Sequence, residues 1–518
     1  GGQTKGLQSK FHVDCTAGLG WFGPYFTAGT VSPQAGAAAP FALRISKPDG
    51  QSDMNGIALS MPEGLLANLK GNVGTRIGTA TVAAGPGSQP FWLNGPVVLE
   101  GPYGDAPFSL RVTVPAVAGP FNLGDVVVRQ KIYVDPTDAH VTVVSDPLPT
   151  IVKGVPVRLQ NLNVDVNKPG FMINPTSCAP KSIGATLRAA TGQTAAVASR
   201  FQVGGCKNLP LKPKMAMDLV GSKEVKRGKH PQLSTTLTQQ PGEAGLKKVQ
   251  VRLPLSLALD PDNAQALCKP EQAVAKACPA GSVVGKATAV SPVLNRPLTG
   301  DVFFVEGTRQ SAEGRTVKTM PRLWVALRGE VSLDVWADSS LEDSKYLVTT
   351  FPIVPDAPIS SFKLDIDGGK NGILAVTGDV GTDLCQRPLV ARAQFDGQNG
   401  KRLISHPLMG SPCTFRVQDK TLYSTRTKVR VSGIEAGKLK ISGKGVKTTR
   451  RTIKNADVAS ISAKLTAAGK RAYKGRKAIR LKVSFDPKAK GQKTRTLKTT
   501  VKRSAAKKKS STRSQRSR

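Results

Sequence analysis

Histidine is scarce in this 518-residue chain, which holds only His12, His140, His230 and His406. Nucleophilic catalysis needs a base held beside a Ser, Thr or Cys, and no GxSxG motif surrounds any serine here. The cysteines do not form the CxxC pairs of a zinc site. We therefore predict a non-enzymatic protein with no catalytic residues, no metal site and no cofactor.

Other motifs are absent or incomplete. The Gly- and Pro-rich segments GPGSQP and GPYGDAP are not followed by Lys-Ser or Lys-Thr, so we expect no phosphate loop. The segment Asp365-Ile366-Asp367-Gly368 lacks the remaining ligands of a calcium loop, which favours a turn. No apolar run approaches the roughly 18 to 20 residues of a transmembrane helix, so no transmembrane segment is expected.

Aromatic residues are also few, at 5% of the chain, although 39% of the residues are hydrophobic. Runs of Val, Leu and Ile recur along most of the length, which excludes disorder throughout. A chain of 518 residues is too long for a single core, and several domains are expected.

The seven cysteines follow a repeated spacing. Cys178 and Cys206 are 28 residues apart, and so are Cys385 and Cys413. Each pair encloses a β-prone run, a turn containing Gly and Gln, and a second run, which predicts a hairpin closed at its base by a disulfide. Disulfides indicate an oxidising compartment, and thus an extracellular, cell-wall or cell-surface location.

The sequence between these hairpins is also repeated. Gly78 in the first copy matches Gly285 in the second, 207 residues later, whereas upstream of them the copies are offset by 192 residues. The second copy therefore contains an insertion. We predict that it forms a short helical turn closed by its own disulfide, between Cys268 and Cys278.

Cys15 has no predicted partner. The segment VDCTAGLG aligns with VGGCKNLP, which places Cys15 on Cys206. We expect Cys15 to end a hairpin that belongs to a preceding copy, and to be unpaired in this chain. An intermolecular disulfide or a reactive thiol is the alternative.

Alternation of apolar and polar residues predicts an all-β fold, built as tandem β-sandwich modules of immunoglobulin-like kind in a beads-on-a-string array. The predicted units are a truncated β-module at 1–60, a long β-module at 61–173, a Cys-closed hairpin with a small β-module at 174–252, a second long β-module at 253–383, a second hairpin at 384–418, a basic immunoglobulin-like sandwich at 419–503, and a disordered basic tail at 504–518.

The net charge of +39 is concentrated at the C-terminal end, where residues 420–518 hold 32 Lys and Arg against three acidic residues. Such a field attracts polyanions, and outside a cell these include anionic cell-wall polymers. Aromatic side chains that could stack on bases are scarce there, which disfavours specific nucleic-acid recognition. Solubility alone is the alternative role of the charge. The predicted polyanion-binding residues are Lys502, Arg503, Lys507, Lys508, Lys509, Arg513, Arg516 and Arg518.

Segments such as LANLKG, GPYGDAPFSLRVTVPAVAGPFNLGDVVVR and SDPLPTIVKGVPVRLQNLNVDVNKPGFMINPTSC resemble the repeats of an uncharacterised family of secreted or surface β-domain proteins of high-GC Gram-positive bacteria. The resemblance covers residues 10–415. In that family a Cys pair follows LANLKG, and here it occurs only in the second copy. The resemblance implies a location and a modular β structure, and it implies no reaction.

These observations predict a secreted or cell-wall-associated surface protein whose modules act as spacer or adhesion units, with a cationic end that binds anionic wall polymer. Two alternatives remain open. One is an extracellular carbohydrate-binding or carbohydrate-processing protein that uses Trp92, Tyr103, Trp324 or Trp336 as sugar platforms on a concave face. The other is nucleic-acid binding through the basic tail. The sequence does not indicate an oligomeric state.

Overall fold

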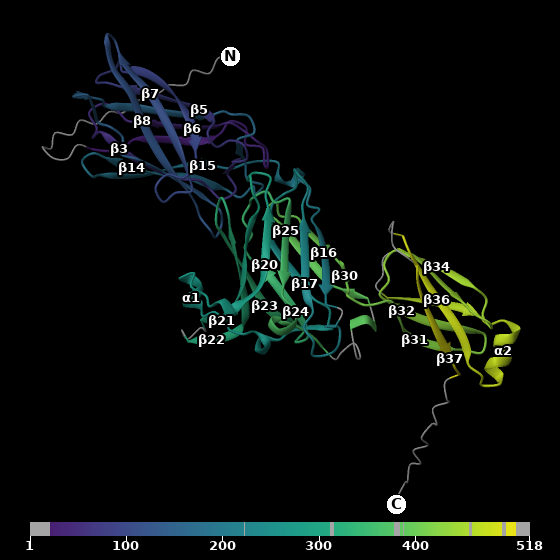
Figure 1. The fold of residues 1–518 in the computed structure, drawn as a ribbon. Helices are drawn as coiled ribbons and strands as arrows, with labels where there is room; N and C mark the ends of the chain where they lie inside the picture. Colours follow the sequence, from purple (N-terminus) through teal and green to yellow (C-terminus); the bar gives the residue numbers. More distant parts are fainter. Residues whose placement is uncertain are drawn as a thin grey trace, which may run out of the picture.

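The computed structural model describes residues 21–221, 223–310, 315–377, 384–386, 388–454, 458–488 and 494–503. Strands dominate the described residues, and the all-β class is confirmed. The strands form three units along the chain (Figure 1). The short helices between them are η1 (Cys206–Asn208), η2 (Pro261–Asn263), α1 (Pro270–Val274), η3 (Ala280–Ser282), η4 (Gly369–Asn371), η5 (Leu384–Gln386) and α2 (Ala467–Lys474).

The first unit is one antiparallel sheet of eleven strands, in the order β1-β2-β12-β5-β6-β7-β8-β9-β3-β14-β15. The sheet curls until its two edge strands meet, and the Ser199 hydroxyl of β15 donates to the Ala28 carbonyl of β1 at 2.9 Å. The strands are β1 (Tyr25–Thr30), β2 (Phe41–Ser46), β3 (Met54–Ser60), β5 (Arg76–Ala84), β6 (Phe91–Glu100), β7 (Phe108–Ala118), β8 (Phe121–Val134), β9 (Val141–Ser145), β12 (Leu159–Val166), β14 (Lys181–Ala189) and β15 (Thr194–Phe201), with the pairs β4 (Leu66–Ala67) and β13 (Met172–Ile173), and β10 (Ile151–Val152) and β11 (Val155–Pro156).

The second unit is a sheet of thirteen strands, in the order β27-β30-β16-β17-β25-β20-β21-β22-β23-β24-β18-β28-β29. Its strands are β16 (Lys214–Val220), β17 (Gln232–Thr238), β18 (Leu246–Arg252), β20 (Val283–Val290), β21 (Leu298–Gln310), β22 (Thr316–Arg328), β23 (Leu333–Glu342), β24 (Tyr346–Phe351), β25 (Ser361–Ile366), β27 (Leu389–Val390), β28 (Arg392–Gly397), β29 (Arg402–Ser405) and β30 (Leu408–Gly410), with the separate pair β19 (Leu257–Leu259) and β26 (Leu374–Val376).

The two large sheets share one strand order. From β16 to β29, each strand of the second sheet takes the place of its counterpart from β1 to β15 in the first, and β27 and β30 extend one edge. A register shift precedes Gly78 in β5 and Gly285 in β20. At both glycines a Cβ atom would collide with a backbone carbonyl, that of Asp165 or Asp365. The repeat predicted from the sequence is therefore confirmed, as a repeat of the whole unit.

The predicted module boundaries inside each copy are wrong. β3 pairs with both β9 and β14, and β2 pairs with β12, so the expected modules at 1–60 and 61–173 share a sheet with the β14–β15 hairpin. The rest of the expected module at 174–252, strands β16, β17 and β18, belongs to the second sheet. In the second copy β18 pairs with β24 and β28 in the same way. Each copy is thus built on one continuous large sheet, and the modules predicted inside a copy are not separate domains. Local alternation identifies strands, but it does not identify their distant partners.

The third unit is a sandwich of two sheets, β31-β32-β35 and β34-β33-β36-β37, around a core that includes Val429, Ile441 and Phe485. The short helix α2 and the closing β36–β37 hairpin complete this unit. The strands are β31 (Arg416–Leu422), β32 (Arg426–Ser432), β33 (Gly437–Ser442), β34 (Thr449–Ile453), β35 (Val458–Lys464), β36 (Ile479–Pro487) and β37 (Arg495–Val501).

Candidate binding cavity

The inner wall of the first unit is built by strict alternation along its long strands. In β7, Phe108, Leu110, Val112 and Val114 line a cavity, while the residues between them do not. Val112 pairs with Val97 on β6 and Val128 on β8, and all three side chains line the same space. Val112 and Val128 point inward but are only half-buried. The interior of the curled sheet is therefore not filled by its own side chains.

The second unit continues this wall with the counterpart strands. Leu233 and Leu237 on β17, Val249 on β18, and Phe362 and Leu364 on β25 line the same cavity as the residues of the first unit. The cavity has a volume of about 600 Å³. None of its lining residues is charged, and the polar ones are Gln130, Ser145, Thr235, Ser291 and Thr349.

The cavity crosses from one unit to the other at a hydrogen-bonded junction. Backbone N–H groups of Leu69 and Lys70 both donate to the Val293 carbonyl, at 2.9 and 3.0 Å. At the end of the β8–β9 hairpin, the Asp334 N–H donates to the Pro136 carbonyl at 2.7 Å. The Leu69 side chain packs against the cores of both units. These contacts join the two apolar walls into one surface.

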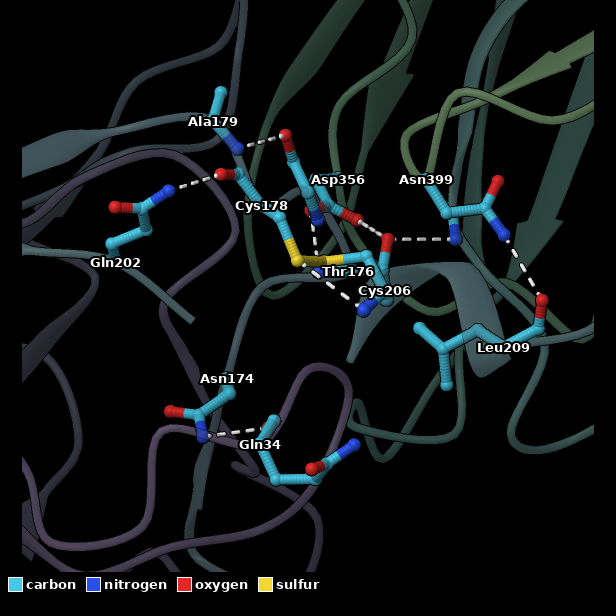
Figure 2. Close-up of a disulfide and its surroundings, with 12 residues drawn as sticks. Gln34, Asn174, Thr176, Cys178, Ala179, Gln202, Cys206, Leu209, Asp356 and Asn399 are labelled. Carbon is cyan, nitrogen blue, oxygen red and sulfur yellow. Dashed lines mark hydrogen bonds between the residues drawn. A yellow bond between two sulfur atoms is a disulfide. The ribbon is translucent and has the colours of Figure 1, made fainter. Parts of the chain in front are cut away.

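A buried carboxylate strengthens the junction beside the first disulfide (Figure 2). Asp356, from the second unit, accepts hydrogen bonds from the Thr176 N–H at 2.7 Å, the Thr176 hydroxyl at 2.5 Å and the Ser177 N–H at 3.1 Å. The Thr176 hydroxyl in turn accepts from the Gly245 N–H at 2.9 Å. Burial raises the pKa of Asp356 above its ordinary value, although these hydrogen bonds favour its ionised form.

The six cysteines predicted to pair lie at bonding distance in the three predicted pairs, Cys178–Cys206, Cys268–Cys278 and Cys385–Cys413. The first joins the start of β14 to the end of β15, and the Cys206 N–H lies 3.2 Å from the Cys178 sulfur. The second encloses α1, the short helix expected in the insertion. Cys15 lies outside the described residues.

The four proposed sugar platforms do not share a concave face. Trp324 is buried, and it is stacked between Phe303 and Trp336 with ring centroids 4.9 and 5.9 Å apart, so neither of its faces is open to a sugar. Trp92 and Tyr103 are in the other copy, where the Tyr103 hydroxyl is bound to Asp146. Trp92 lies on β6 of the first sheet and Trp324 on β22 of the second, so these two tryptophans belong to different units.

Two histidines within the described part of the chain, His140 and His230, lie in turns or loops beside acidic partners. His140 contacts Asp138 at 2.7 Å, and His230 contacts Asp260 at 2.8 Å. Asp135 lies close enough to Asp138 and His140 for all three to offer ligand atoms to one metal ion. The same carboxylates also accept hydrogen bonds from the backbone N–H groups of Thr137 and His140, which is a structural role in the β8–β9 turn.

A cationic sheet face lies on the third unit. Alternation along β33, β36 and β37 directs lysine and arginine outward, and Lys482 stands directly opposite Lys498 in the register. Like charges in directly opposite positions destabilise a sheet. Of the predicted polyanion-binding residues, Lys502 and Arg503 are exposed just after β37, and the others lie outside the described residues. The face residues that the prediction did not include are Lys438, Lys440, Arg450, Arg480, Lys482 and Lys498.

Comparisons with known proteins identify no family. No family model matches the chain, and no curated protein matches it. The C-terminal domain of the AgI/II polypeptide BspA of Streptococcus agalactiae is similar over 75% of this chain and 100% of its own, with 8% identity and a TM-score of 0.17. Dimeric latent PorU from Porphyromonas gingivalis is similar over 92% of this chain and 32% of its own, with 9% identity and a TM-score of 0.14. Likenesses this distant carry no conclusion about the chain.

Within the described segments, the helices are all too short or too polar to cross a bilayer.

Proposed function

We propose that this protein is an extracellular binding protein for a long apolar ligand, such as the acyl chains of a lipid. The supporting observation is the uncharged cavity of about 600 Å³ that the two copies line together. Its volume lies within the range of about 300 to 1,000 Å³ that is usual for ligand sites. Water in such a space needs two to four polar partners, which this wall offers at few places.

The affinity expected for an acyl chain is considerable. Each methylene moved from water into an apolar site contributes about 0.8 kcal/mol, so a chain of about twelve methylenes gains roughly 10 kcal/mol before the cost of ordering it. A dissociation constant near or below the micromolar range is therefore reasonable. Sugars gain nothing comparable from an apolar wall, which disfavours the carbohydrate alternative for this cavity.

The proposed compartment is extracellular or at the cell wall, because three disulfides in one chain are typical of an oxidising environment. The proposed activity is binding and not catalysis. A protein that only spaces or adheres needs no cavity through its core, so ligand binding accounts for the two copies better than a spacer role does.

Binding of the fluorescent fatty acid cis-parinaric acid tests this function, with two neighbouring residues of β8 as a matched pair. Val128 lines the cavity, whereas Val127 faces outward and is 52% exposed. Val128→Asp places a carboxylate where the acyl chain would remove its water, which should weaken binding about a hundredfold or more. Val127→Asp should bind as the unmodified protein does. Absence of binding by the unmodified protein, or equal binding by both variants, would refute the proposal.

We propose a second function for the third unit, retention on an anionic wall polymer. The supporting observation is the cationic face of β33, β36 and β37, where the Lys482–Lys498 pair costs stability with no structural benefit. The double variant Lys482→Ser, Lys498→Ser should elute from immobilised teichoic acid at lower salt than the full chain. The control is Lys207→Ser, Lys212→Ser, which removes the same charge from exposed positions in the segment between the first and second units. Equal elution of the two double variants would contradict a specific face.

A further inference from the structure

The end of the first unit that lies farthest from the second unit is formed by three turns, here called the apical turns: residues 85–92, 119–123 and 150–157. The opposite end of the β7–β8–β9 meander contacts the second unit through Pro136, so these turns project away from it (Figure 1). A hydrogen bond joins the first and third turns, from the Gly85 N–H to the Val157 carbonyl at 2.9 Å, and the third turn is closed by a bond from the Val157 N–H to the Thr150 carbonyl at 2.8 Å. The Lys153 ammonium of the third turn lies beside Gly124, next to the second turn.

The apical turns expose large apolar side chains to solvent. Phe121 is 67% exposed, Ile151 is 63% exposed and Trp92 is 55% exposed, and none of the three lines the cavity. The sequence of the apical turns contains no acidic residue and one basic residue, Lys153. An exposed group of apolar side chains is unusual on a soluble surface and is typical of a protein or membrane contact. One carboxylate lies against these turns, that of Asp49, which accepts a hydrogen bond from the Gly87 N–H at 2.7 Å.

The same turns form an opening of the cavity. Phe91 and Val155 are about half exposed and also belong to the cavity wall, so the wall reaches the surface between the turns. Leu93, Leu123 and Val152 continue it inward from there. A molecule that leaves a bilayer through this opening would pass from one apolar medium to another without crossing water.

We propose that the apical turns dock into the surface of a lipid bilayer, with Trp92, Phe121 and Ile151 inserted among the lipids and the cavity open to them. This inference rests on the proposed binding of an apolar ligand and adds the source of that ligand. A Trp side chain favours the interface between headgroups and acyl chains, and a single lysine can extend its ammonium back to the headgroups. A protein partner would be recognised by polar groups around the apolar centre, and these turns offer few.

Flotation of the full chain with phosphatidylcholine vesicles at physiological salt tests the inference. Neutral vesicles are required because the cationic third unit would bind anionic ones by charge alone. The tip variant is Trp92→Ser, Phe121→Ser, Ile151→Ser. The control is Val274→Ser, Leu341→Ser, Ile404→Ser, which removes exposed apolar side chains from the second unit. The unmodified protein and the control should float, and the tip variant should lose vesicle affinity by about tenfold or more.

Binding of cis-parinaric acid from solution separates this inference from the proposed function. The tip variant should bind the fatty acid as the unmodified protein does, since its three changed residues lie outside the cavity, and this also shows that it is folded. An unmodified protein that binds the fatty acid but does not float overturns docking alone. One that floats through these turns but binds no fatty acid overturns the proposed ligand alone. Equal flotation of tip variant and control overturns docking.

Discussion

Replacement of Asp356 by alanine should loosen the junction between the two copies. Its carboxylate accepts the N–H groups of Thr176 and Ser177 and the hydroxyl of Thr176, all from the other unit. Asp356→Ala leaves two buried N–H donors without a partner, and each such donor costs about 1 to 3 kcal/mol. The alanine variant no longer buries a carboxylate, which is itself unfavourable, and this offsets part of the loss. We expect a net destabilisation of about 3 kcal/mol.

Asp356→Asn is the matched variant, because its amide oxygen can still accept the two N–H groups while the NH₂ group donates to the Thr176 oxygen. We expect it to retain most of the stability. The measurement is urea unfolding followed by tryptophan fluorescence, combined with limited proteolysis of the connection between the units. Trp324 and Trp336 report on the second unit. Equal midpoints for Asp356→Ala and the unmodified protein would refute the role assigned to this carboxylate.

The pH dependence of the same junction follows from the raised pKa of Asp356. The folded protein holds this proton more tightly than the unfolded chain, in which the pKa is near the ordinary value of 3.8. The part of the Asp356 contribution that is linked to protonation is therefore fully present below that value and is lost as the pH rises through the higher folded pKa, whereas the hydrogen bonds from Thr176 and Ser177 do not depend on that proton. Asp356→Asn should remove this component. The free energy of unfolding of the unmodified protein, relative to that of Asp356→Asn, should therefore fall as the pH rises. A rise of this difference with pH would contradict the assignment.

Three further predictions concern single features. Gly95→Ala and Gly300→Ala should each abolish stable folding of their unit, because the new Cβ would collide with the Thr113 or Ala326 carbonyl, whereas Gly101→Ala has open space and should leave the thermal midpoint nearly unchanged. Cys178→Ser, Cys206→Ser should lower the free energy of unfolding by about 2 to 4 kcal/mol, and an unfolding midpoint equal to that of the intact protein would show that the bond has no stabilising role. Lys498→Thr should raise the stability of the third unit by about 0.2 to 1 kcal/mol by removing the like charge opposite Lys482, and a lowered thermal midpoint would contradict this.

The sequence predicted the repeat correctly because its register depends on local signals. Three such signals are visible in the sequence and are found again in the structure. They are the paired glycines such as Gly78 and Gly285, the equal cysteine spacings, and the insertion that holds Cys268 and Cys278. The β8–β9 hairpin was predictable for the same reason, since its strands and its turn are adjacent in the chain.

The boundaries and the cavity were not predictable from local pattern. The pairing of β2 with β12 joins residues more than a hundred positions apart, and alternation is satisfied equally well by any other partner. Alternation along β7 and β8 places Val112 and Val128 on one face of the sheet, but it does not show whether the space in front of that face is filled. The scarcity of aromatic residues was the available signal, because walls of valine, leucine and alanine leave volume that larger rings would occupy.

The identical strand order of the two copies makes this architecture extensible. Each copy contributes its own length of apolar wall. The two walls are joined by contacts between short loops, and no separate domain is needed to connect them. The number of copies would then set the length of the apolar cavity, and thus the length of the apolar ligand that it can shield from water. A chain engineered with a third copy between the present two would have a proportionally longer cavity and would bind a longer apolar ligand.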